Sequence, residues 1–399
     1  MTSRNWPNEF ARACAITSLI TGLLLCLPLG AQTKSPAVAL IDPADAVTWQ
    51  NWTRELGWQV ITAPGTPPTD IDSRVKALAS AVESAILSGS VDPARIYLAG
   101  RGDASAAVFY TISRVPDLWA AAAALGGSPK PALDTNRIFA ANFTNVPVLW
   151  VAGDDARPLA EKLSAAKVNV EFQSSATGAN AASLMKWLAA HQREASPMAI
   201  DCETNSPAFA RCYWIQLAKF DAAERNDVLA STRIAGGSGA ALDLGGFAFK
   251  LDDPGPGVLV ASLPEKYSGP LKMGDRLIAL DGKPLADARQ YTELMEKATD
   301  EKLAVVTVQR GKDRVRVETR VVLPRRDSGV TARVQAQVLP AEKEIQIVTR
   351  TITELRITVA PQWVPATLLW NGLSLESVKE AGCWILTVQK ELLHAEKCK

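Results

Sequence analysis

The chain has 399 residues, of which 47% are hydrophobic, so it is long and apolar enough to build two or three domains with cores of their own. Its 43 basic and 42 acidic side chains leave a formal net charge of +1, with no block of either sign. This balance argues against nucleic acid as a partner, because phosphate backbones are bound by clustered positive charge.

Residues 1–31 have the pattern of an export signal. Arg4 and Arg12 precede an apolar run from about Ala13 to Leu29, and the small pair Gly30-Ala31 offers a cleavage site. We therefore predict a signal peptide and a periplasmic or secreted mature protein. A retained membrane anchor is the alternative, although the run is short for a spanning helix. No later segment is apolar for long enough to span, so no membrane span is expected after cleavage.

The cysteines that follow this segment are Cys202, Cys212, Cys383 and Cys398. An even number of cysteines in an exported chain indicates disulfides rather than free thiols. Local pairings, 202 with 212 and 383 with 398, are favoured, but the other connectivities stay open. The spacing does not match a zinc site and histidine is scarce, so we expect no metal and no cofactor.

Strands and helices alternate from residue 36 to residue 195, which predicts a parallel sheet covered on both faces. The expected strands are 38–42, 58–62, 95–99, 119–125, 146–152 and 168–174. The expected helices are 71–87, 105–115, 159–166 and 181–191.

The turn between the strand 95–99 and the helix 105–115 has the pattern of a nucleophile elbow, in which small residues must flank the nucleophile on either side. Gly100 and Ala104 meet that demand and place Gly102 at the nucleophile position.

Three segments around this turn resemble secreted esterases of the polyhydroxybutyrate depolymerase and feruloyl esterase kind. They are Val91–Gly100, Pro116–Ala121 and Pro147–Asp155. The resemblance implies an α/β-hydrolase fold that carries a serine, a histidine and an acid as its catalytic triad.

The chain departs from the triad of those esterases at each position. Gly102 stands in place of the serine, Ala156 in place of the acid and Asn180 in place of the histidine, and the only histidines are His191 and His394. Because nucleophile, base and orienting acid are all missing, we expect a hydrolase scaffold with no catalytic residue. The alternative is a secreted esterase or serine-type peptidase-like hydrolase that uses an unrecognised constellation.

A connecting segment, 196–241, follows this domain. It contains an expected strand at Tyr213–Leu217. Asp221 and Glu224 fit a capping box, which predicts a short helix to about Ala230.

Residues 242–324 predict a small β-rich domain with one helix. The expected strands are 247–251, 258–263, 276–280, 303–309 and 315–322, and Asp287 can cap a helix that runs to Ala298. The segments Gly257–Val260 and Gly269–Leu285 resemble the PDZ domains of bacterial periplasmic proteases.

That resemblance implies binding of an extended peptide or a protein C-terminus beside a strand, with the carboxylate held by backbone N–H groups of a glycine loop. The residues expected at this groove are Leu244, Gly245, Gly246, Phe247, Ala248, Phe249, Tyr291, Leu294 and Met295. For each apolar side chain among them, core packing is the alternative.

The last part, 325–399, shows period-two alternation in strands at 331–338, 344–349, 354–360, 366–370 and 383–388. This predicts a small antiparallel β-sandwich. Tyr213–Leu217 could add a strand to it, and the PDZ-like domain would then be an insertion. Taken together, the sequence predicts an exported, non-catalytic binding or scaffold protein with several domains, α/β and β. The competing hypotheses are the hydrolase above and a purely structural envelope protein without a ligand.

Overall fold

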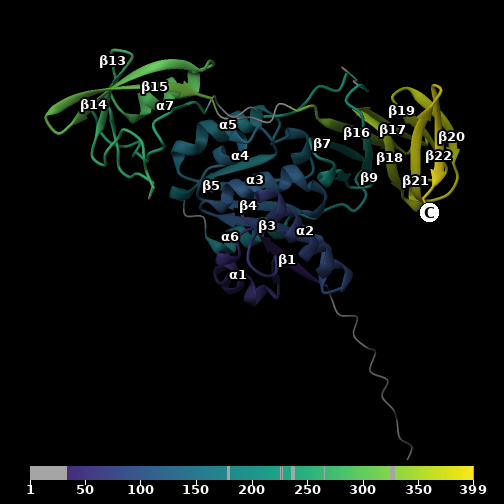
Figure 1. Cartoon of the computed structure of the whole chain (residues 1–399). Helices are drawn as coiled ribbons and strands as arrows, with labels where there is room; N and C mark the ends of the chain where they lie inside the picture. The colour runs from purple at the N-terminus through teal and green to yellow at the C-terminus, as the bar shows by residue number, and fades with distance from the viewer. Residues whose placement is uncertain are drawn as a thin grey trace, which may run out of the picture. The chain divides into compact units, whose positions relative to one another are not determined.

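The computed structural model describes residues 34–177, 180–224, 226, 228–234, 239–264, 266–323 and 329–398 (Figure 1). The predicted signal peptide at 1–31 lies outside these residues. Within them, no helix is long and apolar enough to cross a membrane. The chain forms a six-stranded parallel sheet and several antiparallel sheets.

The parallel sheet has the strand order β2-β1-β3-β4-β5-β6. Its strands are β1 (Ser35–Leu40), β2 (Gln59–Thr62), β3 (Val91–Arg101), β4 (Ala121–Leu125), β5 (Val148–Ala152) and β6 (Val170–Ser174). The chain goes from β1 to β2 and then crosses to β3 on the other side of β1, so the winding reverses between β1 and β3. In open α/β sheets, ligands bind beyond the carboxyl ends of the strands at such a point.

Helices cover both faces of this sheet because side chains along each strand alternate between two cores. Ala37 and Ala39 of β1 join the core shared with α2, α3 and α5, whereas Val38 and Leu40 join the core shared with α1 and α6. The helices are α1 (Ala46–Thr53), α2 (Ile71–Leu87), α3 (Ala104–Arg114), α4 (Lys130–Asp134), α5 (Arg157–Ala165) and α6 (Ala181–Ala189). The predicted two-sided parallel sheet is therefore present.

A second sheet has the order β10-β15-β14-β12-β11, with β13 paired to β12, and every pair in it is antiparallel. Its strands are β10 (Ala241–Leu242), β11 (Val258–Leu259), β12 (Arg276–Leu280), β13 (Lys283–Pro284), β14 (Lys302–Arg310) and β15 (Asp313–Val322). Helix α7 (Ala288–Lys297) buries Tyr291 and Met295 in the same core. Asp287 caps this helix as predicted, since its Oδ1 accepts a hydrogen bond of 2.8 Å from the N–H of Gln290.

The predicted strand at 247–251 is wrong. Only Ala248 forms a bridge there, with Ser262, and β11 is shorter than the predicted 258–263. The reason is local: left-handed glycines at 245 and 246 precede the segment and the turns at 251–257 follow it, so few of its residues can pair.

Two further sheets enclose one common core. One has the order β20-β19-β17-β16-β7 and the other β22-β21-β18-β9-β8. The strands are β7 (Ala199–Thr204), β8 (Arg211–Cys212), β9 (Ile215–Phe220), β16 (Ala332–Leu339), β17 (Glu344–Arg350), β18 (Ile352–Val359), β19 (Ala366–Trp370), β20 (Leu373–Val378), β21 (Gly382–Gln389) and β22 (Leu392–Lys397). All pairs are antiparallel except β17 with β19, which is parallel. The predicted antiparallel arrangement is therefore wrong for that pair.

Strands from distant parts of the sequence build these two sheets together. β7 pairs with β16, and β9 pairs with β18. In the sequence, the second sheet (241–322) therefore lies after β7 and β9 and before their partner strands β16 and β18. The short helix predicted to run from Asp221 to Ala230 is wrong: the described residues there form turns, and Thr351 N–H donates to Glu224 O at 2.7 Å instead.

The four cysteines form two disulfides, Cys202 with Cys212 and Cys383 with Cys398. The first joins β7 of one sheet to β8 of the other, and the second joins β21 to the residue after β22. Disulfides of this kind fit an oxidising, exported environment.

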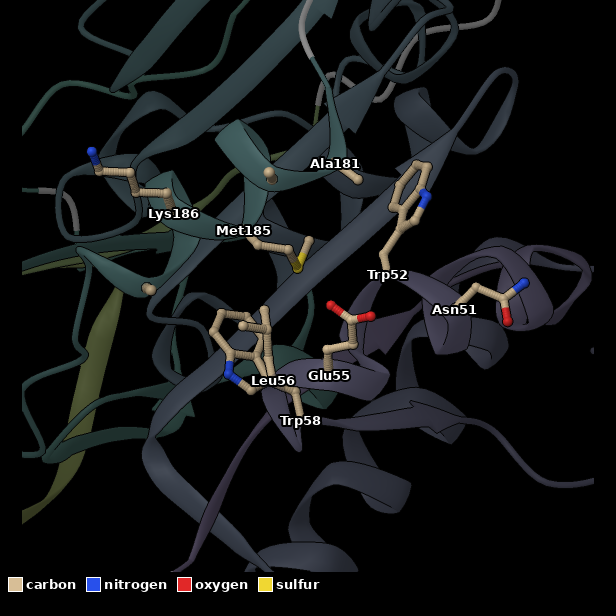
Figure 2. A pocket seen from close by; sticks show the side chains of 10 residues that line it. Asn51, Trp52, Glu55, Leu56, Trp58, Ala181, Met185 and Lys186 are labelled. Carbon is tan, nitrogen blue, oxygen red and sulfur yellow. The ribbon is translucent and has the colours of Figure 1, made fainter.

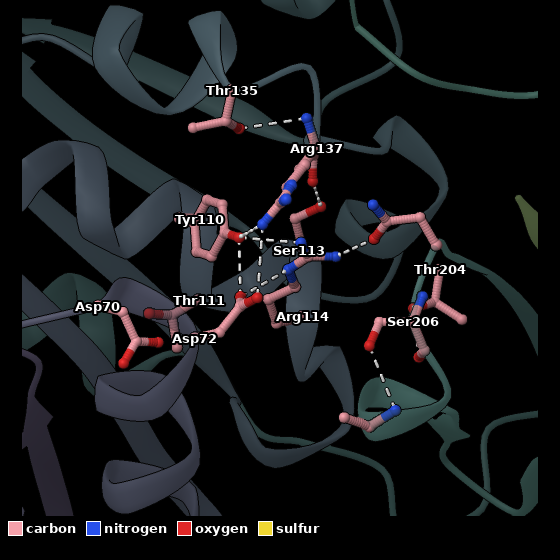
Figure 3. Close-up of polar contacts among 12 residues, drawn as sticks. Asp70, Asp72, Tyr110, Thr111, Ser113, Arg114, Thr135, Arg137, Thr204 and Ser206 are labelled. Carbon is pink, nitrogen blue, oxygen red and sulfur yellow. Dashed lines mark hydrogen bonds and ion pairs between the residues drawn. The ribbon is translucent and has the colours of Figure 1, made fainter. Parts of the chain in front are cut away.

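A buried network of hydrogen bonds and ion pairs connects α3 to the turn after β7 (Figure 3). Arg114 is only 2% exposed, and its guanidinium donates to Asn205 Oδ1 at 2.6 Å and to the hydroxyl of Tyr110 at 2.9 Å. Its Nε lies 3.4 Å from Asp72. A buried charge of this kind is tolerated because it is both paired and hydrogen-bonded.

Candidate functional site

The turn between β3 and α3 has the tight geometry that the sequence predicts. Gly102 has a φ of +54°, its N–H donates to Leu125 O at 2.8 Å, and its carbonyl accepts from Ser105 N–H at 3.0 Å. A Cβ at Gly100 would lie 2.8 Å from Ala104 O, so no larger residue fits at that flank. The turn lies at the carboxyl end of β3, beside the point where the winding of the sheet reverses.

Side chains near Gly102 are engaged in structural contacts. Ser105 is fully buried, and its hydroxyl donates to Gly126 O at 2.6 Å. Arg101 lies 3.7 Å from Asp45 and over the ring of Trp52. Neither side chain is a nucleophile poised for attack.

The positions expected for the acid and the histidine have structural roles. Ala156 ends a 3-10 turn, Asp154–Ala156, in which Asp154 accepts from Arg157 at 2.9 Å. This hydrogen bond from Arg157 lowers the pKa of Asp154. Asn180 caps α6: its Oδ1 accepts from Ser183 N–H at 2.9 Å, and the Ser183 hydroxyl accepts from Asn180 N–H.

Both histidines are accounted for elsewhere. His191 follows the C-terminal end of α6, with its Nδ1 2.9 Å from Trp187 O and its ring 4.3 Å from the Trp187 ring. Asn180 is at the other end of that nine-residue helix, which is about 14 Å long. His394 lies on β22, paired with Thr387.

A cavity of about 390 Å³ opens at this edge of the parallel sheet. Its polar lining consists of the guanidinium of Arg101, the amides of Gln173 and Asn180, and the hydroxyl of Ser183. No carboxylate, imidazole or thiol is among the described residues that line it. The sequence interpretation missed Arg101 and Gln173, although Arg101 ends β3, Gln173 lies near the end of β6, and both strands were predicted.

A second candidate site is the glycine loop before the bridge at Ala248. Gly245 and Gly246 have φ values of +80° and +79°. Leu244 is buried in the core, and its carbonyl accepts from the hydroxyl of Tyr267 at 2.6 Å. A Cβ at Gly269 would lie 2.3 Å from that hydroxyl, so a glycine is required where the loop packs.

The backbone N–H groups of Gly245, Gly246 and Phe247 have no acceptor within hydrogen-bond distance in the part of the chain that is described. Successive N–H groups in such a turn form a concave anion site. A carboxylate is the anion that a peptide C-terminus would bring.

A groove of about 260 Å³ runs from this loop along α7. Aromatic rings form its floor: Phe249 and Tyr291 meet edge to face with centroids 5.6 Å apart, and Phe247 lies 5.7 Å from Phe249. Burial raises the pKa of Tyr291 to about 12, so its hydroxyl stays neutral.

The structure brings some of the predicted groove residues together and not others. Gly246, Phe247, Phe249, Tyr291 and Met295 line the groove. The predicted residues that do not line it are Leu244, in the core; Gly245, against Tyr267; Ala248, bridged to Ser262; and Leu294, 41% exposed.

The lining residues that the sequence interpretation missed lie on three segments: Thr292 and Glu296 on α7, Lys130 and Asp134 on α4, and residues 239–242. Thr292 and Glu296 follow Tyr291 and Met295, so the helical spacing of four residues was the signal that could have found those two.

No protein-family model and no curated protein matches this chain. Solved structures match parts of it. A thermostable esterase shares 16% identity over 40% of this chain and 55% of its own, with a TM-score of 0.31. Esterase PE8 shares 17% over 35% of this chain and 82% of its own, with a TM-score of 0.27. An S-formylglutathione hydrolase from Staphylococcus aureus shares 10% over 39% and 82%, with a TM-score of 0.29.

The chain thus spans about half the length of the thermostable esterase. With TM-scores of 0.27 to 0.31, these likenesses do not indicate an activity, so the residues of the sites decide what this chain can do.

Proposed function

We propose that this chain is an exported binding protein that captures the C-terminal end of an extended peptide in the groove beside α7. The observation that carries the proposal is the loop at 245–247, whose three N–H groups have no acceptor among the described residues and lead into an aromatic groove. A peptide C-terminus supplies both a carboxylate for the loop and an apolar side chain for the groove.

The finer domain assignments belong to the same proposal. We assign residues 36–195 to a hydrolase-like domain and 242–324 to a PDZ domain. The strands of 199–220 and 332–397 then form one β-sandwich into which the PDZ domain is inserted. The shared core of the two sheets and the pairing of β7 with β16 support this assignment.

The hydrolase-like domain is proposed to be non-catalytic. Support comes from Gly102 at the nucleophile position, from Asn180 as the cap of α6, and from a lining without acid or base among the described residues of the cavity. The loss of the triad is a prediction that assays must test.

The peptide proposal is tested with a library of peptides that end in apolar residues, each made with a free carboxylate and as a C-terminal amide. We expect the free acids to bind the mature protein and the amides to bind at least about tenfold more weakly, because the loop N–H groups lose a charged acceptor. Phe247→Ala should weaken binding, whereas Leu294→Ala, on the same domain but outside the groove, should leave it unchanged. Equal binding of acid and amide, or no binding of any peptide, would refute the proposal; the second result favours a structural protein without a ligand.

The alternative function is ester or peptide hydrolysis, and the retained strand–turn–helix geometry around Gly102 favours it. It is tested by comparing turnover of p-nitrophenyl esters and of peptides with that of a heat-unfolded sample. The acids closest to the vacant positions are Asp103 and Asp155. Turnover that disappears in Asp103→Asn or Asp155→Asn would establish an enzyme and overturn the non-catalytic proposal.

A further inference from the structure

A second cavity, separate from the peptide groove and the elbow turn, lies between α1 and α6 (Figure 2). It has a volume of about 570 Å³. Trp52, Leu56, Trp58 and Met185 give it an apolar wall, and Glu55 is the only carboxylate among the described residues that line it. Figure 2 shows the carboxylate of Glu55 turned toward the space between the two indoles.

The two indoles are held in place by packing. Trp58 stacks on Tyr97, with centroids 5.1 Å apart and planes at 24°. Trp52 meets Trp49 edge to face, also at 5.1 Å. The rings therefore form a wall that does not need to be ordered when a ligand binds, which lowers the entropy cost of binding.

Trp52 already accepts a cation on one side. The guanidinium of Arg101 lies 5.6 Å from the centroid of its ring. Arg101 lines the cavity at the edge of the sheet and not the cavity between α1 and α6, whereas Trp52 lines both. The ring thus takes part in both cavities, and an aromatic ring attracts cations.

The charged side chains that line this cavity are Glu55 and Lys186, and their placement favours a cationic ligand. Within the described chain, no basic side chain lies within ion-pair distance of Glu55. Arg54 is engaged by Asn51 Oδ1 at 2.9 Å, and Figure 2 shows Lys186 turned away from the indoles. A lone carboxylate beside aromatic rings repels anions and supplies too few ligands for a metal ion, but it suits an organic ammonium group.

We propose that the cavity lined by Trp52, Glu55 and Trp58 binds an organic cation, a quaternary or alkylated ammonium group on a small apolar body. The indoles contact the methyl or alkyl groups of the cation, and Glu55 neutralises its charge. This site is independent of the peptide groove, so the two proposals can fail separately.

The test compares two probes of the same shape, choline and 3,3-dimethylbutan-1-ol, in which a carbon replaces the charged nitrogen. Binding to the mature protein is followed by the NMR shifts and line widths of the methyl signals. We expect choline to bind about fivefold more tightly than the alcohol, mainly because the carboxylate of Glu55 attracts its charge, with the indoles as cation–π partners. Equal affinities, or no saturable binding of either probe, would overturn the proposal.

Matched variants locate the site. Glu55→Gln keeps the shape of the side chain and should remove most of the preference for choline while leaving the affinity for the alcohol unchanged. Lys186→Gln, on the rim with its ammonium turned away, should keep the preference. A preference for choline that survives Glu55→Gln, in a variant whose circular dichroism matches the native protein, would place the cation elsewhere and refute the assignment.

Discussion

Substitution of Gly102 by serine tests the turn at the end of β3 directly. The residue has a φ of +54°, where side chains with a Cβ are strained. A Cβ built there meets no atom within 4 Å, so the loss comes from the backbone conformation alone. A non-glycine residue in the left-handed region costs about 1–2 kcal/mol. We therefore expect Gly102→Ser to fold and to lose about 1 kcal/mol of its free energy of unfolding.

Two glycines provide matched controls in the same urea denaturation assay. Gly57 has a φ of +65° and equally open surroundings, so Gly57→Ser should show a similar loss. Gly100→Ala should lose more, about 2–3 kcal/mol, because its Cβ would lie 2.8 Å from Ala104 O. A Gly102→Ser variant that is as stable as the native protein, or less stable than Gly100→Ala, would show that the turn is not as described.

The same variant tests whether a base is within reach of the elbow. Gly102→Ser should not hydrolyse p-nitrophenyl acetate, since Asn180 is occupied as a helix cap and His191 lies at the far end of α6. The double variant Gly102→Ser, Asn180→His places an imidazole in the loop, although loss of the cap costs about 1 kcal/mol. Turnover by the double variant above both single variants would show that the scaffold keeps hydrolase geometry. Strong turnover by Gly102→Ser alone would reveal a base that the structure does not show.

Three further predictions concern stability. Burial opposes ionisation of Asp275, but hydrogen bonds, mainly from Arg310 at 2.7 Å, outweigh it and lower its pKa. The native protein should therefore be about 2 kcal/mol more stable than Asp275→Asn at pH 7, and urea titrations should show this difference shrinking as the pH falls below about 4. Glu203→Gln should lose about 2 kcal/mol in the same assay, because an amide cannot accept every hydrogen bond made to this buried carboxylate. Replacing Cys202 and Cys212 together by alanine should cost about 2–3 kcal/mol, and the intact mass of native protein should lack the hydrogens of all four thiols.

Local signals in the sequence predicted the parallel sheet well. The run 146–152 is apolar without interruption, as a strand buried on both faces must be, and β5 lies there. The tight turn at Gly102 was predictable because its flank at Gly100 has no room for a larger side chain. The cap of α7 by Asp287 was predictable for the same reason, since a cap depends on neighbouring residues only.

Features that depend on distant residues were not predictable from local patterns. The stretch 221–230 carries a capping-box pattern, yet its backbone pairs with residues near 351, so tertiary hydrogen bonds replace the helix. The cavity between α1 and α6 combines Trp52 and Trp58 with Met185, more than 120 residues later. No periodicity in either segment indicates that these side chains meet.

Glu203 is a buried carboxylate that connects segments far apart in the sequence. Glu203, only 1% exposed, lies on β7. It accepts hydrogen bonds from Ser231 Oγ at 2.5 Å and Thr232 N–H at 2.6 Å, just before the inserted sheet, and from Thr331 Oγ1 at 2.5 Å, just after it. With no cation beside it in the described chain, its charge is satisfied by hydroxyl and backbone donors alone, so it is stable only while both segments stay together. Glu203 thus holds together the segment that precedes the second sheet and the segment that follows it.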